Sequence, residues 1–201
     1  VEQRTESLYK GTAPNAYRQG ICPDGWHLPS DREWNRLEKE IYNNVTKDSI
    51  YTSKQISKFA PANWQESFEL SKQGDGSPER GSKTGGDAFG HGAAMNEMCT
   101  VNDWYMNWLS TSKGFSKPPW DGGFNLMHVG IVEPGLNINT DEEEWIKQHY
   151  GYTTILWSSS TDYAGTALIR HSNLSESTIK RYNNKLDRYY SVRCVRNEIR
   201  Y

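Results

Sequence analysis

The sequence predicts an α+β fold in which two or more helices pack on short, twisted antiparallel sheets. Three observations indicate it: a well-capped amphipathic helix near the N-terminus, a series of short strand-like runs in the last third, and a length of 201 residues. That length suits one domain. We therefore expect a single domain over residues 1–201, with a long, irregular and glycine-rich insertion at about residues 47–123.

The composition indicates a folded chain with an aromatic core. Eight tryptophans and twelve tyrosines supply large side chains with polar tips, whereas disordered chains have few aromatic residues. The formal net charge is only −2, which gives neither the basic surface that binds nucleic acid nor a polybasic membrane patch. No apolar run reaches the length of a transmembrane helix, so we expect no integral membrane protein.

The first regular element is a helix in the segment "CPDGWHLPSDREWNRLEKEI". Ser30 and Glu33 have the spacing of a capping box, which predicts a helix from Ser30 to Asn43. Its polar face, expected to be in solvent, carries Arg32, Arg36, Lys39 and Glu40.

The other face of this helix is apolar. Trp34, Leu37 and Ile41 recur at helical spacing, so we expect them to be buried against the terminal sheet that contains Val192.

The middle of the chain has weaker patterns. Residues 71–92 hold seven of the 17 glycines and predict a long, mobile loop. Trp104 and Trp108, four residues apart, predict one short helix after it. The run "GSPERGSKT" misses the phosphate-binding loop template by one residue, so nucleotide binding is not indicated.

Two further elements are expected before residue 150. The run "GGFNLMHVGIVEPG" predicts a strand that ends at Pro134–Gly135. Thr140 and Glu143 form a second capping box followed by acidic residues, which predicts a second helix and explains the acidic cluster without calcium.

The last third predicts an antiparallel meander. The runs "TTILWSSS", "TALIRHS", "STIKRYN" and "YYSVRCVRN" are β-branched or aromatic and are separated by turn residues. Leu168, Ile169 and Ile179 should anchor this sheet, and Tyr190, Val192 and Cys194 should share one face of the final run.

Polar residues of the meander form the main candidate for a ligand-binding face. They fall at turns or at alternate positions, so we expect them to face solvent, where mixed donors, acceptors and tyrosines suit a polar ligand or a protein surface. A merely soluble surface is the alternative. The candidates are Asp162, Tyr163, Arg170, Asn173, Arg181, Asn183, Asn184, Lys185 and Asp187.

The tryptophans divide into two groups. Trp26, Trp34 and Trp157 lie in regular apolar contexts and are expected in the core. Three others lie in polar, loop-rich surroundings typical of a sugar-stacking platform, although packing beneath the insertion is the favoured explanation. They are Trp104, Trp108 and Trp120.

Neither the cysteines nor the histidines match a catalytic or metal-binding template. Cys22, Cys99 and Cys194 have no metal-ligand spacing, and the five histidines include no HExxH pattern. From spacing alone, three unpaired cysteines and a disulfide between the two near the ends are both open; that disulfide would close a loop worth about 5 kcal/mol and would indicate an oxidising compartment. We expect no metal, no cofactor and no catalytic residue.

At "CPDGWHLPSDREW" and "LWSSSTDY…YYSVRCVRN" the chain resembles the Fibrobacter succinogenes major paralogous domain, a family of bacterial surface and secreted proteins. The resemblance covers roughly residues 8–40 and 124–197. It implies a branch of the C-type lectin-like fold, in which a cysteine before the first helix pairs with one in the last strand. Cys22 and Cys194 occupy these places, so the resemblance implies that they are bonded and that Cys99 is not.

The resemblance also bears on activity. "HLPSDREW" is similar to the "RLPTEAEWE" helix of formylglycine-generating enzymes, which rely on two active-site cysteines in their C-terminal part, where this chain has only Cys194. Calcium-dependent lectins use Glu-Pro-Asn and Trp-Asn-Asp motifs, but here Gly135 follows Glu133–Pro134 and "WSSS" replaces the second motif. Some proteins of this fold carry hypervariable C-terminal segments, with which the composition of residues 161–187 is compatible.

These expectations add up to an exported, non-catalytic binding or adhesion module. Its ligand would be polar, such as a glycan, or a protein surface, and not nucleic acid. The expected location is the cell surface, the periplasm or an outer-membrane lipoprotein, with any targeting segment already removed. The alternatives are a structural component of a surface or fimbrial assembly and, less favoured, a relative of the formylglycine-generating enzymes.

Overall fold

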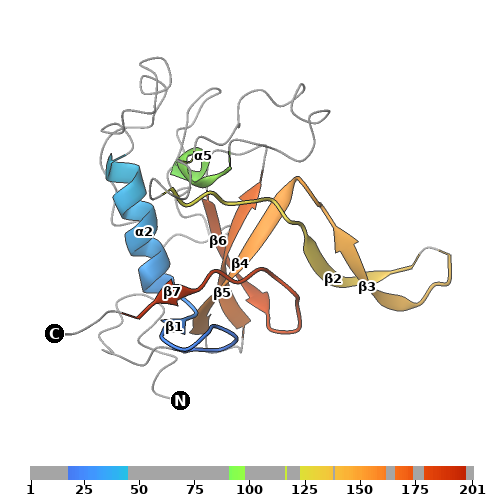
Figure 1. Cartoon of the computed structure of the whole chain (residues 1–201). Helices are drawn as coiled ribbons and strands as arrows, with labels where there is room; N and C mark the ends of the chain where they lie inside the picture. The colour runs from blue at the N-terminus through green and yellow to red at the C-terminus, as the bar shows by residue number, and fades with distance from the viewer. Residues whose placement is uncertain are drawn as a thin grey trace.

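The computed structural model describes residues 18–44, 91–97, 116, 123–137, 139–161, 166–173 and 179–197. Figure 1 shows how the elements within them are arranged. In chain order they are β1 (Trp26–His27), α2 (Asp31–Asn44), α5 (His91–Met95), β2 (Ile131–Leu136), β3 (Glu143–Gln148), β4 (Thr153–Thr161), β5 (Thr166–Asn173), β6 (Ile179–Lys185) and β7 (Val195–Arg196).

The described part of the chain is mainly β structure. Its strands form three small antiparallel sheets, of order β1-β7, β2-β3 and β4-β5-β6. Of the two helices in the described residues, only α2 is longer than five residues. The expected C-type lectin-like α+β fold, with two or more helices packed on the sheets, is therefore wrong.

The predicted meander is confirmed by the three-stranded sheet. Strand β5 lies between β4 and β6 and pairs antiparallel with both, from Thr153↔Asn173 at one end to Thr166↔Lys185 at the other. The fourth predicted run is not a full strand of this sheet, although a parallel bridge joins its Ser191 to Leu156 of β4. It makes single bridges at Tyr189 and Ser191 and ends as β7, which pairs with β1.

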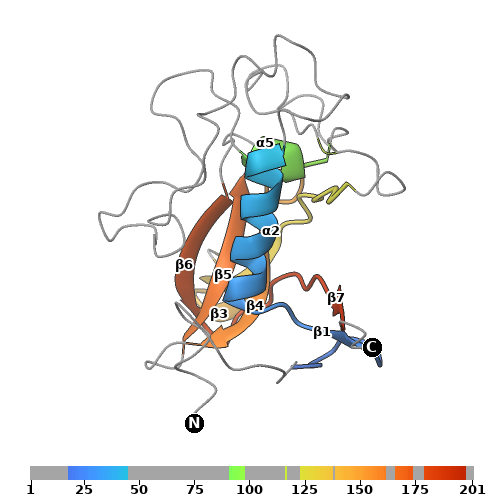
Figure 2. The ribbon, with the colours of Figure 1, turned by 90° about the vertical axis from the view of Figure 1, so that its left-hand side faces the viewer.

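Helix α2 lies over one face of the three-stranded sheet (Figure 2). Its start follows from the capping box: the Ser30 amide donates to Glu33 Oε2 at 2.8 Å, and the Glu33 amide donates to Ser30 Oγ at 3.3 Å. The helix spans Asp31–Asn44, one residue from each predicted end. The four residues predicted for its solvent face are exposed: Arg32, Arg36, Lys39 and Glu40.

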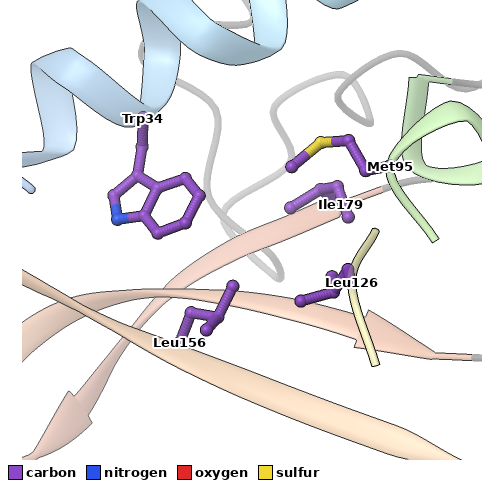
Figure 3. Packing of buried hydrophobic residues seen from close by; sticks show 5 residues of the cluster. All are labelled: Trp34, Met95, Leu126, Leu156 and Ile179. Atoms are coloured by element: carbon purple, nitrogen blue, oxygen red, sulfur yellow. The ribbon is translucent and has the colours of Figure 1, made fainter. Parts of the chain in front are cut away.

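The main apolar core lies between α2 and this sheet (Figure 3). Trp34 contacts a cluster that includes Leu156 of β4 and Ile179 of β6, with Met95 and Leu126 beside them. The partly buried Leu37 and Ile41 pack against the same cluster. The expected burial of the apolar helix face is confirmed, but its partner is the meander and not the segment around Val192.

The two ends of the described chain are joined covalently. Cys22 and Cys194 form a disulfide with an S–S distance of 2.08 Å, as the family resemblance implied. Strands β1 and β7 pair next to it, with Trp26 opposite Arg196. Trp26 is 40% exposed, so its expected place in the core is wrong, whereas Trp34 is fully buried.

A hairpin replaces the helix predicted after Thr140. Glu143–Gln148 is strand β3 and pairs along its whole length with β2. The Asp141 amide donates to the Asn137 carbonyl and so closes a single helical turn. The turn does not continue as a helix, because Asp141 has a φ of 59°, in the left-handed region. Tertiary pairing thus overrides the capping signal, because a strand at this position satisfies the backbone of β2.

Pro134–Gly135 lies inside β2 and does not end it, contrary to expectation. Proline has no amide hydrogen to donate, so it is tolerated where a strand has a neighbour on one side only. This holds at Pro134, because β2 contacts the Tyr189 segment only at Val132, and beyond Val132 the only strand beside β2 among the described residues is β3. Gly135 leaves room for the Ile146 side chain: a Cβ at this position would lie 2.5 Å from Ile146 Cδ1, so that side chain would have to shift.

Several expectations lie outside the described residues. They concern most of the insertion at 47–123, the glycine-rich loop, Cys99 and the short helix around Trp104. No helix in the described ranges is long and apolar enough to cross a membrane.

Candidate functional site

The register of the three-stranded sheet sorts its side chains onto two faces. Leu156, Arg170 and Arg181 lie opposite one another across β4, β5 and β6, on the face toward α2. The neighbouring row lies on the other face, which we call the outer sheet face.

Arg170 and Arg181 are buried beneath α2. Each is only 1% exposed, so the expectation that they face solvent is wrong. Arg170 donates from Nη1 to Asp31 Oδ1 at 2.7 Å and from Nε to Glu38 Oε1 at 2.5 Å. Arg181 holds Asp31 with two bonds of 2.8 Å, and His91 Nε2 lies 2.9 Å from Glu38 Oε2.

This buried network joins the helix to the sheet. Burial acts against the charge of Arg170, but the carboxylates of Asp31 and Glu38 raise its pKa above the ordinary value. Asn35 accepts a further bond from Arg170 at 2.9 Å, so Asp31, Asn35 and Glu38 form a polar stripe on α2. The charges are paired and shielded from solvent, which makes the network a structural element.

The outer sheet face is different, because it is only partly covered. Ile155 and Ile169 at its centre pack with Ile131 and Tyr190 in a second core cluster. Beside that cluster the face carries partly exposed polar and aromatic side chains. They are His171 and Asn173 from β5, and Lys180, Tyr182 and Asn184 from β6.

A hydrogen-bonded group fixes one border of this face. The Tyr190 hydroxyl donates to Glu133 Oε1, and Asn184 Nδ2 donates to the same hydroxyl oxygen at 2.6 Å. Burial and the bond to Glu133 raise the pKa of Tyr190, so the phenol stays protonated. The Tyr190 ring packs on Trp157, with 4.9 Å between ring centroids.

His171 lies at the middle of the outer sheet face. Its ring meets the Tyr182 ring edge to face, with centroids 5.8 Å apart, and its Nε2 atom is buried without a hydrogen-bond partner. Burial, with repulsion from Lys180 and His149, lowers the pKa of His171 to about 4 despite the opposing effect of Glu133. The imidazole is therefore neutral at pH 7.

The predicted ligand residues are not all brought together. Asn173 and Asn184 lie on the outer sheet face, whereas Asn183 lies on the face toward α2, as Arg181 does. Lys185 and Asp187 are exposed at and after the end of β6. The remaining candidates lie outside the described residues: Asp162, Tyr163, Trp104, Trp108 and Trp120.

Sequence reasoning missed five residues of this surface: Glu133, His171, Lys180, Tyr182 and Tyr190. A signal for three of them was present in the alternation of strand side chains. Along β5 the side chain of His171 points away from that of Arg170, and along β6 those of Lys180 and Tyr182 point away from that of Arg181. Glu133 and Tyr190 come from other segments, and their approach depends on tertiary structure.

A second polar group, His128, Ser172 and Asn96, is closed to ligands. His128 Nε2 lies 3.1 Å from Ser172 Oγ, which donates to Asn96 Oδ1 at 2.7 Å. Ser172 is 1% exposed, so this hydroxyl cannot meet a substrate. Among the residues that the structure describes, no group of three or more His, Cys, Asp or Glu side chains is placed to hold a metal ion.

Comparison with known proteins gives one match. A family model described as the Fibrobacter succinogenes major domain matches residues 2–196, nearly the whole chain. No curated protein and no solved structure matches it.

Proposed function

The chain belongs to the Fibrobacter succinogenes major domain family, and from this premise we propose that it is a non-catalytic binding module that holds a polar ligand, such as a glycan, on its outer sheet face. The resemblance to surface and secreted proteins supports a binding or adhesion role. The chemistry of the outer sheet face supports a ligand rich in hydroxyl groups.

The observation that carries this proposal is the set of prearranged groups around Tyr182. Tyr182 and His171 offer ring surfaces, Glu133 offers carboxylate oxygen, and Asn184 offers an amide already oriented by its bond to Tyr190. A sugar ring presents an apolar face for stacking and hydroxyl groups for hydrogen bonds. Strands hold these side chains with little freedom to lose on binding, which favours affinity.

The proposal includes export to the cell surface, the periplasm or an outer-membrane lipoprotein. The disulfide between Cys22 and Cys194 supports it, because such bonds persist in oxidising compartments. The absence of catalysis is also part of the proposal. Its support is that the Ser172–His128 contact is sealed and that Arg170 and Arg181 are committed to buried carboxylates.

A glycan array followed by titration calorimetry tests the proposal. We expect the purified chain to bind a subset of glycans, and Tyr182→Ala combined with Asn184→Ala to weaken that binding by about tenfold or more, the loss expected for one or two contacts of about 1.4 kcal/mol in total. The matched control is Arg32→Ala with Arg36→Ala on the exposed face of α2. This control should bind as the wild type does.

Melting temperature separates loss of binding from loss of fold. Binding lost with the melting temperature retained supports the outer sheet face. Equal binding by wild type and the Tyr182/Asn184 variant would exclude this surface, and no binding to any glycan would exclude the ligand class.

A second function, a structural part of a surface or fimbrial assembly, is favoured by a separate observation. The hairpin β2-β3 projects from the rest of the described chain (Figure 1), and its exposed Trp145 contacts the exposed Tyr189 of the segment after β6.

A further inference from the structure

One face of the hairpin β2-β3 is apolar at its centre and open to solvent. The register places Trp145 opposite Pro134, and Val132 and Leu136 lie on the same face of β2. Lys147 and Glu143, opposite Val132 and Leu136, put one charge of each sign on the same face. Tyr189 completes the face: its ring centroid is 4.6 Å from that of Trp145. Trp145 is 48% exposed, Leu136 53% and Tyr189 62%. Contiguous exposed apolar side chains of this kind mark contact surfaces, and tryptophan and tyrosine are the side chains that dominate such contacts.

The tip of the same hairpin is acidic. Asp141, Glu142, Glu143 and Glu144 follow one another and are all exposed. Within the described part of the chain none of the four takes part in an ion pair. Together, the apolar face and the acidic tip require a partner surface that is apolar and basic.

A surface with these two properties exists on the chain itself, at β1 and β7. Trp26 pairs with Arg196, and Arg18 bridges to Leu28, so Arg18, Trp26 and Arg196 lie on one face. Trp26 is 40% exposed, both arginines are exposed, and Ile21 in the adjoining turn is 83% exposed. The disulfide next to this patch holds its two segments together.

The hairpin and this patch cannot meet within one molecule. Figure 1 shows β1 and β7 at one side of the described chain and the hairpin pointing away from the other side. A contact between them joins two copies through different surfaces. Such a heterologous contact leaves a free hairpin at one end and a free patch at the other, so it repeats as an open chain unless the rotation closes a ring.

We propose that copies of this chain associate head to tail, with the hairpin face of one copy (Val132, Pro134, Leu136, Trp145, Tyr189 and the acidic tip) docked on the Arg18, Ile21, Trp26 and Arg196 patch of the next. This contact serves the assembly role named above and does not depend on the ligand-binding role of the outer sheet face. The formal net charge of −2 sets up little overall repulsion between copies, so the local charge pattern decides the contact.

Sedimentation velocity of the purified full chain over a range of concentrations tests this proposal. We expect the average mass to rise with concentration in low salt and to fall when salt is raised, because exposed charges are screened. Trp145→Ala should lower the association constant by about tenfold or more, as expected for a central aromatic contact.

Charge reversal gives the sharper test. Glu142→Lys, Glu143→Lys and Glu144→Lys together turn the tip charge from −4 to +2 and should abolish self-association, and so should Arg18→Glu with Arg196→Glu. When these two variants are mixed, each hairpin again meets a patch of opposite charge, so association should return. The control matched to the patch variant is Arg32→Glu with Arg36→Glu on α2, which lowers the net charge by the same amount and should associate as the wild type does.

Three results would overturn the proposal: a wild type that stays monomeric at every concentration, association unaffected by either charge reversal, or a mixture that does not recover. Circular dichroism and melting temperature of each variant confirm that the fold is intact. Binding of the hairpin face to a glycan or to another protein, with no self-association, would assign that face to a different partner.

Discussion

At the scale of single residues, the molecule separates its polar side chains into buried pairs and a partly open surface. Arg170 and Arg181 are sealed under α2 by Asp31 and Glu38, while Asn184 and Tyr190 are held at the border of the outer sheet face. Sequence reasoning placed the arginines in solvent because arginine is rarely buried unless it is paired. The pairing carboxylates lie about 130 to 150 positions away in the chain, and no local pattern shows that they meet.

The buried network predicts that removing one partner is costly. Arg170→Ala should lower the free energy of unfolding by about 3–5 kcal/mol, because Asp31 loses one of its two arginines and Glu38 loses its guanidinium in a dry site. Denaturant unfolding measures the loss. The exposed Arg36 is the control, and its replacement by alanine should cost less than about 0.5 kcal/mol. An equal, small cost at both positions would show that the network contributes no stability.

His128 and His171, whose pKa values are lowered, predict sensitivity to acid. Burial, with a contribution from His171, lowers the pKa of His128 to about 4, and the pKa of His171 is lowered to about the same value, from a model-peptide value of 6.5. Above pH 6.5 both are neutral in the folded and unfolded chains. As the pH falls from 6.5 to 4, only the unfolded chain takes up these protons, so each histidine removes up to about 3 kcal/mol of stability.

Unfolding curves measured from pH 7.5 to 4.5 check this dependence. The double variant His128→Gln, His171→Gln should have a flatter profile between pH 6.5 and 5 than the wild type. Parallel profiles of wild type and variant would contradict the lowered pKa values.

At the scale of elements, prediction succeeded where local and tertiary signals agree. The Ser30–Glu33 box, the spacing of Trp34 and the β-branched runs of the meander each favour the structure that forms. It failed at Thr140–Glu143, where a strong helix-capping pattern lies in a hairpin. The competing signal there is the pairing of β3 with β2, which a single sequence window does not contain.

The docking of α2 predicts a large effect at Trp34. Trp34→Ala should cost about 3–5 kcal/mol, because the indole is fully buried among Met95, Leu126 and Leu156 and its loss leaves a cavity. The matched control is Trp26→Ala, in which a partly exposed indole of the same size is removed. Thermal unfolding should show a much larger drop in melting temperature for Trp34→Ala than for Trp26→Ala. An equal drop for the two variants would contradict the docking of α2 through Trp34.

At the scale of the whole molecule, the disulfide joins the two ends of the described chain. Its 172-residue separation is long, so replacing Cys22 and Cys194 by alanine should destabilise the fold by about 5 kcal/mol in the chain-entropy account. Comparing the melting temperatures of wild type and variant with and without a reducing agent checks this. A wild type whose melting temperature is insensitive to reduction would contradict it.

The overall fold class was the least predictable level. Family resemblance located both ends of the domain and the disulfide, but the expected layer of helices is not present in the described residues, where α2 covers one face of the main sheet with only the short α5 beside it. That leaves the opposite face of the sheet partly open. The open face is the basis of the proposed function, and no pattern within the individual strands reveals which face stays open.

The central claim is that this outer sheet face holds the ligand, and nuclear magnetic resonance of the isotope-labelled chain tests it most directly. The chain is titrated with the tightest-binding glycan of the array, and amide shifts are followed. We predict changes concentrated at residues 171–173 and 180–184 and near Glu133 and Tyr190, with α2 unaffected. Shifts confined to α2 or to the hairpin tip, or no shifts at saturating glycan, would contradict the claim.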